Sequence, residues 1–340
     1  MGGRAILPSF AKIRSFRRAL LSWYDQHRRE LPWRRGRDPY RIWVSEIMLQ
    51  QTRVAAVLEH YARFMQRFPT VQALAAAREN TVLALWSGLG YYHRARRMHE
   101  AAKIIVRERA GVFPVNAEEW LELPGIGRYT AAAIASIAFD EPVAVVDGNV
   151  ERVLERLLGS PQEREAAWQA AGDLLDRERP GDFNQAMMEL GATVCTPRAP
   201  QCLVCPVRSF CKTRGLEPAR PQPPRKSKNT YYGLARRGES VLLVQRPADA
   251  SLMAGMWELP ALAPETVNGN KPLLTVRHSI TDTDYRVSVF TVSAERAAGL
   301  ASGARWYTAA QCERLALTGL TRKILRKLAA ESIKGAALSK

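Results

Sequence analysis

The sequence predicts a multidomain protein in which an all-α domain is followed by a smaller α+β domain. Apolar residues recur at helical spacing along most of residues 1–214 of the 340-residue chain. The segment 215–230 is rich in proline and basic residues and lacks apolar periodicity, as interdomain linkers do. Residues 231–340 then carry short β-branched runs, one of which alternates apolar and polar residues as a half-buried strand does. The length allows each domain a core of its own.

The composition indicates a folded protein with a polyanionic partner. Hydrophobic residues make up 46% of the chain and charged residues 24%, which excludes a disordered chain. The 50 lysines and arginines exceed the 33 acidic residues by 17. Neutralising phosphates supplies much of the affinity of proteins for DNA, so nucleic acid is favoured over an acidic protein or a membrane surface. No apolar run approaches the roughly 18 residues that a membrane span needs.

The N-terminal segment is basic and has no acid before Asp25, as in a transit peptide. Its apolar residues fall at helical spacing, however, and no secretory apolar region precedes a cleavage site. We therefore expect a first helix from about Phe10 to Tyr24, packed on the core, in a cytoplasmic protein. A loop begins after it at Leu31-Pro32-Trp33-Arg34.

An acid falls on an apolar stripe in the next segment. The stripe consists of Trp43, Ile47, Val54, Val57 and Leu58 at helical intervals, and Glu46 lies on or beside it. A carboxylate in such a position is costly unless it is paired or protonated. Two interpretations stay open. Glu46 forms a salt bridge with one of the many arginines, or it is a desolvated acid with the raised pKa that a general acid needs.

The stretch 122–154 combines a glycine turn with a carboxylate. Gly125 and Gly127 lie in the tight turn Leu123-Pro124-Gly125-Ile126-Gly127, which opens into a predicted small-residue helix at 130–137. Free amide groups at a helix N-terminus bind phosphate. Asp147-Gly148-Asn149 follows an apolar run and precedes another helix, so Asp147 or Asn149 could simply cap that helix. A phosphate-binding turn followed closely by a carboxylate favours an acid that acts on nucleic acid.

The remaining helices are separated by short loops. One loop places Tyr91 and Tyr92 beside a cluster of arginines, which is typical of a DNA-facing loop but also of ordinary packing. The helices are predicted at 52–67, 71–74, 79–85, 94–109, 168–176 and 184–190.

Four cysteines follow the last of these helices within a short, proline-containing stretch. They are Cys195, Cys202, Cys205 and Cys211, in the spacing C-x6-C-x2-C-x5-C. Two local disulfides are disfavoured in a cytosolic chain, and four thiolates so close together indicate a metal site. Zinc and a [4Fe–4S] cluster both accept four cysteines, and spacing alone does not separate them. The distant Cys312 is expected to be a small buried side chain.

The C-terminal part is predicted to have strands at 240–245, 273–276 and 286–292 and a helix at 320–330. It contains 15 basic and 9 acidic residues and is therefore also net positive.

The helical part resembles a known superfamily. LPGIGRYTA followed by VDGNVERVL is similar to the helix-hairpin-helix and Gly/Pro…Asp pattern of the DNA glycosylases that include endonuclease III, with the helix-hairpin-helix at about 122–138. The cysteine spacing at 195–211 resembles the iron–sulfur loop of those enzymes and implies a [4Fe–4S] cluster. Leu243–Pro247 and Gly255–Pro260 look like the opening of a Nudix domain, but ALAPETVNGNKPLLTVRH follows in place of the metal-binding acids. Such a shell without its acids is a binding module.

Together these features resemble the MutY family of adenine DNA glycosylases, which remove adenine mispaired with 8-oxoguanine. The motifs are LPWR, SEIMLQQTRV, GLGYYHRAR, LPGIGRYT, VVDGNV and the four cysteines. The resemblance implies that Glu46 protonates the adenine leaving group, that Asp147 supports the cationic sugar and that Asn149 assists. It also implies that Arg34, Gln51, Tyr91, Gly125 and Gly127 contact DNA and that Glu189 holds the adenine edge.

The C-terminal domain departs from the family at one loop. The family often carries His-x-Phe-Ser-His, which reads 8-oxoguanine, and the best match here is His278-Ser279-Ile280-Thr281-Asp282. Ile280 keeps a wedge without stacking and Thr281 keeps a hydroxyl, so both are candidate lesion contacts.

Two rival functions remain at the level of sequence. An endonuclease III-like lyase would need a lysine nucleophile where Tyr129 stands, and a non-catalytic iron–sulfur DNA-binding protein would have lost Glu46 or Asp147. We therefore expect a monofunctional hydrolase, a monomer acting on double-stranded DNA with A:8-oxoguanine or A:G mispairs. The expected setting is the bacterial cytoplasm, in association with the nucleoid.

Overall fold

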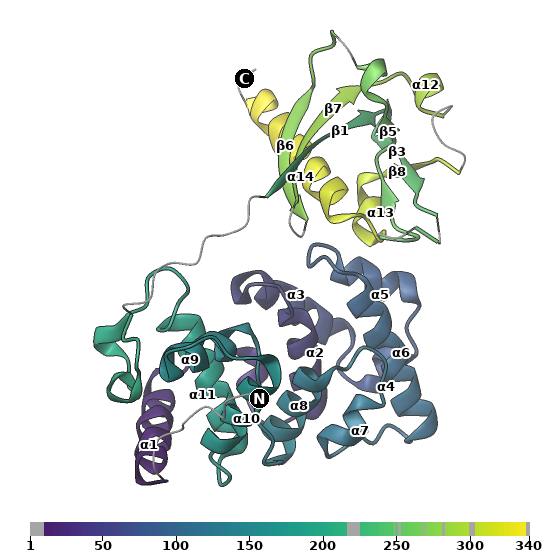
Figure 1. The fold of residues 1–340 in the computed structure, drawn as a ribbon. Coiled ribbons are helices and arrows are strands. Elements are labelled where there is room, and N and C mark those ends of the chain that lie inside the picture. Colours follow the sequence, from purple (N-terminus) through teal and green to yellow (C-terminus); the bar gives the residue numbers. More distant parts are fainter. Residues whose placement is uncertain are drawn as a thin grey trace. The chain divides into compact units, whose positions relative to one another are not determined.

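The computed structural model describes residues 10–215, 225–247, 249–250, 253–267, 269–280, 283–298 and 303–337 (Figure 1). The chain forms two compact units. The first contains residues 1–61, 68–75 and 100–221, and the second contains residues 62–67, 76–99 and 222–340. No helix in the described ranges is long and apolar enough to cross a membrane.

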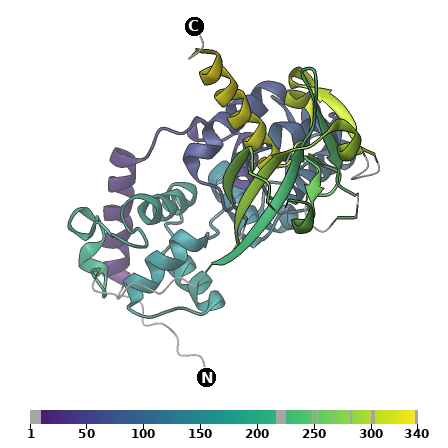
Figure 2. The ribbon, with the colours of Figure 1, turned by 90° about the horizontal axis from the view of Figure 1, so that it is seen from above.

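Helices make up the first unit, as the periodicity predicted. Helix α1 lies beside α11 in both views, and the apolar faces of α1, α9, α10 and α11 enclose one core (Figures 1 and 2). The elements are α1 (Phe10–His27), η1 (Pro32–Arg34), α2 (Pro39–Leu49), the start of α3 (Val54–Arg67), α4 (Val71–Ala75), the end of α6 (His93–Glu108), α7 (Ala117–Leu121), α8 (Arg128–Phe139), α9 (Gly148–Leu158), α10 (Arg164–Leu174), α11 (Pro180–Thr193), η2 (Cys202–Val204) and η3 (Arg208–Phe210).

Local chemistry explains where the helices of the first unit begin. Asp38 caps α2 by accepting hydrogen bonds from the backbone of Tyr40 and Arg41, and Pro39 occupies the first turn, where no N–H is needed. Asp147 caps α9 in the same way. Gly125, with φ of 79°, makes the left-handed turn that lets α8 start after Gly127.

Two glycines of α11 allow its close approach to neighbouring elements. A Cβ on Gly191 would lie 2.7 Å from Cβ of Asn149, and a Cβ on Gly181 would lie 2.5 Å from the carbonyl oxygen of Ser136. Both distances are well inside van der Waals contact. The absence of a side chain at these positions therefore brings α11 against the start of α9 and the end of α8.

The single apolar stripe predicted from Trp43 to Leu58 is wrong. Helix α2 ends at Leu49, α3 begins only at Val54, and Gln51 between them has φ of 55°. Because of this break, the apolar residues of α3 do not continue the buried face of α2, and Leu58 is 38% exposed. Glu46, on the first half, keeps its predicted buried position.

The second unit combines helices with two small sheets. One sheet has the strand order β5-β1-β7-β6, and the other joins β2, β3, β4 and β8. Its elements are the end of α3, α5 (Glu79–Trp86), the start of α6, β1 (Lys226–Leu234), β2 (Arg236–Arg237), β3 (Ser240–Gln245), β4 (Trp257–Glu258), β5 (Ala261–Leu262), η4 (Pro264–Thr266), β6 (Leu274–Ile280), β7 (Thr283–Thr291), α12 (Ala294–Ala298), β8 (Arg305–Thr308), α13 (Ala309–Arg314) and α14 (Gly319–Ala337).

Helix α14 covers one face of the β5-β1-β7-β6 sheet (Figure 1). Ile324 on the helix and Val287 and Val289 on β7 are completely buried in this core. Side chains on successive strand positions point to opposite faces, so the other face carries Asn229, Arg277 and Arg286. All three are exposed, so this part of the face is open, whereas Phe290 further along the same face is buried against Leu262 and Val267.

The linker predicted at 215–230 is shorter than expected at its C-terminal end. Strand β1 begins at Lys226, so residues 226–230 pair with β7 in a parallel ladder. The residues at this end of the strand are exposed, charged and polar, as linker residues are. The start of the strand was therefore not predicted from the sequence. Residues 216–224 of the expected linker lie outside the described residues.

Candidate active site

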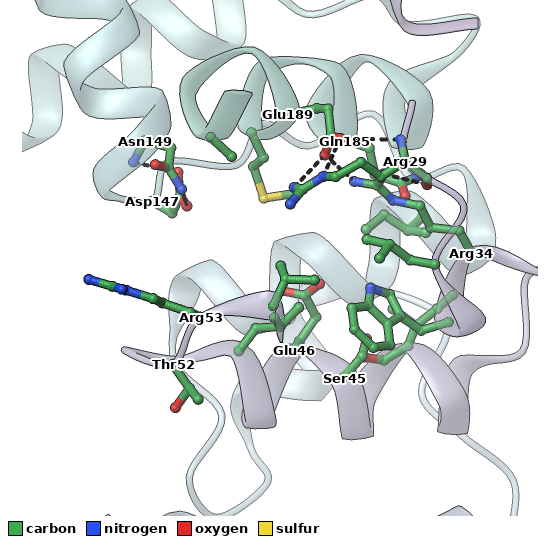
Figure 3. A pocket seen from close by; sticks show the side chains of 18 of the residues that line it. Arg29, Arg34, Ser45, Glu46, Thr52, Arg53, Asp147, Asn149, Gln185 and Glu189 are labelled. Atoms are coloured by element: carbon green, nitrogen blue, oxygen red, sulfur yellow. Dashed lines mark hydrogen bonds and ion pairs between the residues drawn. The ribbon is translucent and has the colours of Figure 1, made fainter. Parts of the chain in front are cut away.

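A cavity of about 490 Å³ in the first unit brings together most of the predicted catalytic residues (Figure 3). Its walls come from η1, α2, α8, the start of α9 and α11. The lining includes Arg34, Glu46, Tyr129, Asp147, Asn149 and Glu189. These residues are spread over more than 150 positions of the sequence, and the helical core is what assembles them.

Glu46 is a buried acid held by a single close hydrogen bond. Its side chain leaves α2 toward the cavity and the residue is only 6% exposed. The hydroxyl of Tyr129 donates to Oε2 of Glu46 at 2.6 Å. Burial, with a smaller contribution from Asp147, raises the pKa of Glu46 to about 7, although Tyr129 and Arg34 act in the opposite direction. The carboxyl group can therefore carry a proton near neutral pH, as a general acid requires.

Tyr129 belongs to α8, directly behind the glycine turn. Burial and the neighbouring Glu46 and Asp147 raise the pKa of Tyr129 well above its usual value, so the phenol stays a hydrogen-bond donor. Its oxygen also lies 3.4 Å from Sδ of Met188 on α11. The residue therefore fixes the orientation of Glu46 and offers no amine to the cavity.

Asp147 both caps a helix and lines the cavity. Its Oδ1 accepts hydrogen bonds from the backbone of Asn149 and Val150 at 2.9 and 2.8 Å, and its Oδ2 accepts from Nδ2 of Asn149 at 2.8 Å. Backbone N–H groups and the positive end of the α9 dipole stabilise a carboxylate there. The capping alternative left open by the sequence is thus correct, and it is compatible with an electrostatic role in the cavity.

Glu189 is fully engaged by two arginines (Figure 3). Its Oε1 accepts from Nε of Arg29 at 2.6 Å, and its Oε2 accepts from Nη2 of Arg29 and Nη2 of Arg34 at 2.8 and 2.9 Å. Burial would raise the pKa of Glu189, but the two guanidinium groups outweigh it and hold the pKa below its usual value. The carboxylate is therefore a charged anchor that orients both guanidinium groups at the cavity wall.

Sequence reasoning missed Arg29, which lines the cavity together with Arg53, Gln185 and Met188. Arg29 lies 160 residues from its partner Glu189, and nothing in the local pattern distinguishes it from the arginines around it. Only its position just before the LPWR motif could have drawn attention to it.

Of the predicted DNA contacts, Arg34 lines the cavity and the other four lie outside it. Gln51 and Tyr91 have φ of 55° and 47°, a left-handed backbone that is uncommon for residues other than glycine and that often marks functional sites. Gln51 is exposed in the first unit, and Tyr91, in the second unit, is half-buried with the guanidinium of Arg94 5.4 Å from its ring centre. Gly125 and Gly127 are exposed at the turn before α8.

The four cysteines line one small cavity in the first unit, of about 30 Å³. All four are free thiols and all are half-buried, so the two local disulfides are not formed. Within the described ranges, no three His, Cys, Asp or Glu side chains are arranged to hold a single metal ion. Four thiols converging on one cavity, with Arg156 donating to Sγ of Cys195 at 3.3 Å, are a donor set that fits a thiolate-bound cluster.

The side chain of Arg152 connects the cysteine loop with Asn149 at the start of α9. Arg152 of α9 donates from Nε to the carbonyl of Cys195 at 2.9 Å and from Nη2 to Oδ1 of Asn149 at 2.9 Å. Its Nη2 also donates to the carbonyl of Gly191 at 2.7 Å. Since Asn149 in turn donates to Asp147, these hydrogen bonds run without interruption from the loop to the cavity carboxylate.

Two carboxyl groups in different environments face this cavity. One is buried and has a pKa raised to about 7, and the other sits at a helix N-terminus that stabilises its charge. This is the pair that glycosidic bond cleavage requires, one group to protonate the leaving group and one to stabilise positive charge on the sugar.

Fold and site together define a DNA glycosylase of the helix-hairpin-helix class. Residues 44–174 match the HhH-GPD superfamily base excision DNA repair protein family, and residues 230–327 match the NUDIX domain family. The solved structure of a thermostable thymine-DNA glycosylase aligns with 61% of this chain and 98% of its own, with a TM-score of 0.56 and 30% identity. An endonuclease III–DNA complex aligns with a TM-score of 0.54 at 23% identity, a likeness of fold alone.

Curated relatives narrow this class to one family. The rat adenine DNA glycosylase is 37% identical over 94% of this chain and 79% of its own length. The mouse and human adenine DNA glycosylases are 43% and 42% identical over 78% and 74% of the chain, which spans only 64% and 58% of their lengths. The chain belongs to the adenine DNA glycosylase family. The resemblance read from the sequence motifs is thereby confirmed.

The candidate lesion loop is only partly visible. Ile280 ends β6, where its backbone pairs with Thr283 across the hairpin, and nothing is described of its side chain. Thr281 and Asp282 lie outside the described residues. Both lesion contacts stay predictions.

Proposed function

We propose that this protein removes adenine mispaired with 8-oxoguanine, or with guanine, from double-stranded DNA by hydrolysing the N-glycosidic bond. The observation that carries the proposal is the buried Glu46, hydrogen-bonded to Tyr129 and sharing a cavity with Asp147. A base within the duplex cannot reach such a cavity, so the adenine is flipped out of the stack.

Glu46 acts as the general acid. Its proton passes to a ring nitrogen of adenine, so that the base leaves as a neutral molecule. The carboxylate of Asp147 stabilises the positive charge that develops on the deoxyribose, and Asn149 keeps Asp147 oriented through the 2.8 Å hydrogen bond to Oδ2. Water then forms a bond to C1′ of the deoxyribose and gives a proton to the Glu46 carboxylate, which leaves an abasic site. Such acid catalysis contributes about 10²–10⁴ in rate.

Arg29 and Arg34 form the base-recognition wall of the cavity. Glu189 balances the charge of both guanidinium groups, which lowers the free-energy cost of removing them from water beside a bound base. Their remaining N–H groups can donate hydrogen bonds to the acceptor nitrogens of adenine. Glu189 was predicted to hold the adenine edge itself. Because both of its oxygens already accept hydrogen bonds, we propose that it acts on the base chiefly through the two arginines.

The remaining roles follow the family resemblance. Gln51 and Tyr91 occupy the space left by the flipped base, and the amides after Gly125 and Gly127 hold a backbone phosphate. Cys195, Cys202, Cys205 and Cys211 hold a [4Fe–4S] cluster, which would keep the cysteine loop folded. Ile280 and Thr281 read 8-oxoguanine in a C-terminal domain at 231–340, joined by a linker to a glycosylase domain at 1–214. The enzyme acts as a monomer on chromosomal DNA in the bacterial cytoplasm.

A single-turnover comparison tests this proposal. Wild-type protein should release adenine from duplexes with A opposite 8-oxoguanine and, more slowly, from A opposite guanine, and it should leave a duplex with thymine glycol intact. Glycol removal, or trapping of a covalent DNA complex by borohydride, would instead identify a lyase. Such a lyase needs an amine, which Tyr129 lacks.

The cluster is tested separately on purified protein. Wild-type protein should contain iron and acid-labile sulfide and absorb in the visible range, and Cys202→Ser should lose most of both. A colourless protein with one equivalent of zinc would contradict the assignment.

A further inference from the structure

Asp147 is preceded by a stretch of irregular backbone. Residues 140–147 connect α8 with α9 and belong to no helix or strand. Val145 in this stretch is 1% exposed and packs against Ala132 and Ala133 of α8. Apolar packing is non-directional, so it buries the stretch without fixing its position along its own axis. Directional hydrogen bonds are needed to fix that position.

The side chain of Asn184 on α11 supplies these hydrogen bonds. Its Oδ1 accepts from the backbone N–H of Val145 at 3.2 Å, and its Nδ2 donates to the carbonyl oxygen of Val143 at 2.8 Å. Because the amide carries a donor and an acceptor side by side, it pairs with both backbone groups as a neighbouring strand would. Its Nδ2 also donates to Oγ of Ser136 on α8 at 2.9 Å.

Asn184 acts from behind the cavity wall. The residue is only 2% exposed and does not line the cavity, whereas the next residue of α11, Gln185, does (Figure 3). One residue separates Val145 from Asp147, so a shift of the backbone at Val145 also moves the carboxylate. On its other side, Asp147 is held by the backbone N–H groups at the start of α9.

We propose that Asn184 is a positioning residue that fixes Asp147 at the distance from Glu46 which adenine release requires. The inference rests on the proposed function only in taking Asp147 and Glu46 as the two acting carboxyl groups. A displacement of about 1 Å in such a group can cost about 100-fold in rate.

Removal of the amide tests this role in the full-length protein. Asn184→Ser takes away both fixed hydrogen bonds and leaves room for water at the backbone of Val143 and Val145. The single-turnover rate of adenine release should fall about 10- to 100-fold. Affinity for the mispair, measured by fluorescence anisotropy, should stay close to wild type, because Asn184 lines no part of the cavity.

The pH–rate profile separates positioning from a loss of folded protein. Burial is the largest effect that raises the pKa of Glu46, and Asp147 raises it further, whereas Tyr129 and Arg34 lower it. When Asp147 is no longer held in place, its effect on Glu46 weakens and the pKa of Glu46 falls. The midpoint of the profile should therefore move to lower pH in Asn184→Ser. A smaller folded fraction would lower the amount of adenine released and leave the midpoint unchanged.

Two variants serve as matched controls. Tyr40→Phe removes a buried hydrogen bond of 2.9 Å to the carbonyl oxygen of Phe68, away from the cavity. Ser136→Ala removes the third hydrogen bond of Asn184 and keeps its two bonds to the backbone. Both should keep the wild-type rate constant and midpoint. If Asn184→Ser has the same rate constant and midpoint as Tyr40→Phe, the proposal is wrong.

Hydrogen exchange gives a readout that needs neither activity nor a stable variant. In wild type, the amides of residues 143–147 should exchange about as slowly as those of α8. Fast exchange of this stretch beside a protected α8 would overturn the role of Asn184. If wild type releases no adenine, the proposed activity fails, and exchange still decides whether the stretch before Asp147 is held.

Discussion

Glu46 shows how much of a catalytic residue's chemistry lies in its surroundings. A glutamate on an apolar helix face could have been paired with an arginine, and the sequence left that open. In the structure the cavity arginines Arg29 and Arg34 bind Glu189 instead, and the hydrogen-bond partner of Glu46 is the neutral Tyr129. The acid therefore keeps the raised pKa that burial imposes.

The first prediction concerns Glu46 and pH. The proton needed for catalysis is present below the pKa of about 7 and is lost above it. The single-turnover rate of wild type should be flat at acid pH and fall about tenfold per unit above neutral. Glu46→Gln should lower the rate by about 10²–10⁴ while keeping affinity for the mispair. A Glu46→Gln variant whose single-turnover rate is within threefold of wild type would show that Glu46 is not the general acid.

The second prediction uses the hydrogen bond from Tyr129. That bond favours the ionised form of Glu46, so Tyr129→Phe should raise the pKa of Glu46 further. The midpoint of the pH–rate profile should therefore move to higher pH, although the ring still fills its place. Tyr92→Phe, a change in a buried tyrosine outside the cavity, is the matched control and should leave the midpoint unchanged. A shift to lower pH would contradict the assigned geometry.

At the scale of elements, α9 joins the catalytic carboxylate to the cysteine loop. Its first residue follows the cap Asp147, and Arg152 one turn later reaches Cys195, Gly191 and Asn149 together. The planar guanidinium group makes these bonds simultaneously, which the single ammonium of lysine cannot do. The position of Asn149 should thus depend on the loop, although the two are far apart in sequence.

The third prediction follows from Arg152. Arg152→Lys should lower the single-turnover rate by about tenfold, which corresponds to about 1.4 kcal/mol, as expected for one lost hydrogen bond to a charged donor. Iron content should fall only slightly, because the cysteines are unchanged. Arg164→Lys, an exposed change at the start of α10, is the control. Full activity in Arg152→Lys would mean that Asn149 is held by Asp147 alone.

At the scale of the whole molecule, the C-terminal part is proposed to read the base opposite the flipped adenine. The fourth prediction is that Ile280→Ala/Thr281→Ala weakens binding to A:8-oxoguanine by about 1–3 kcal/mol, as for a lost base-edge contact, and leaves A:G binding nearly unchanged. Competition binding at one salt concentration measures both. Equal weakening of the two substrates would assign lesion recognition to the rest of the chain.

A truncation provides the complementary measurement. Protein ending at Arg225 should retain measurable activity on A:G, since every residue lining the catalytic cavity precedes that point. Its preference for A:8-oxoguanine should be reduced. Unchanged preference would contradict a reading role for the C-terminal part.

The sequence predicted those parts of the molecule that local pattern determines. Helix periodicity located most of the helices, although the short helices α7, α12 and α13 were not predicted. The helix-hairpin-helix, Glu46, Asp147 and the cysteine loop were singled out because each carries its own motif. The Arg29–Glu189 ion pair could not be predicted from the sequence, because its members are 160 residues apart and arginines are abundant. A separate helix was predicted from residue 52, but the change of direction at Gln51 was missed because the apolar spacing continues across it. The pairing of Arg277 with Arg286 depends on strand register, which no local pattern shows.

The contact of Gly191 with Asn149 has a genetic consequence. Every amino acid that one base change in a glycine codon can produce carries a Cβ, and any Cβ here would meet Asn149 at 2.7 Å. The backbone around Asn149 would have to move, and with it the carboxylate that α9 presents to the cavity. No single-base change that replaces Gly191 therefore gives a residue that fits without movement of the backbone. A lineage that changes it would lose adenine excision before it lost the fold.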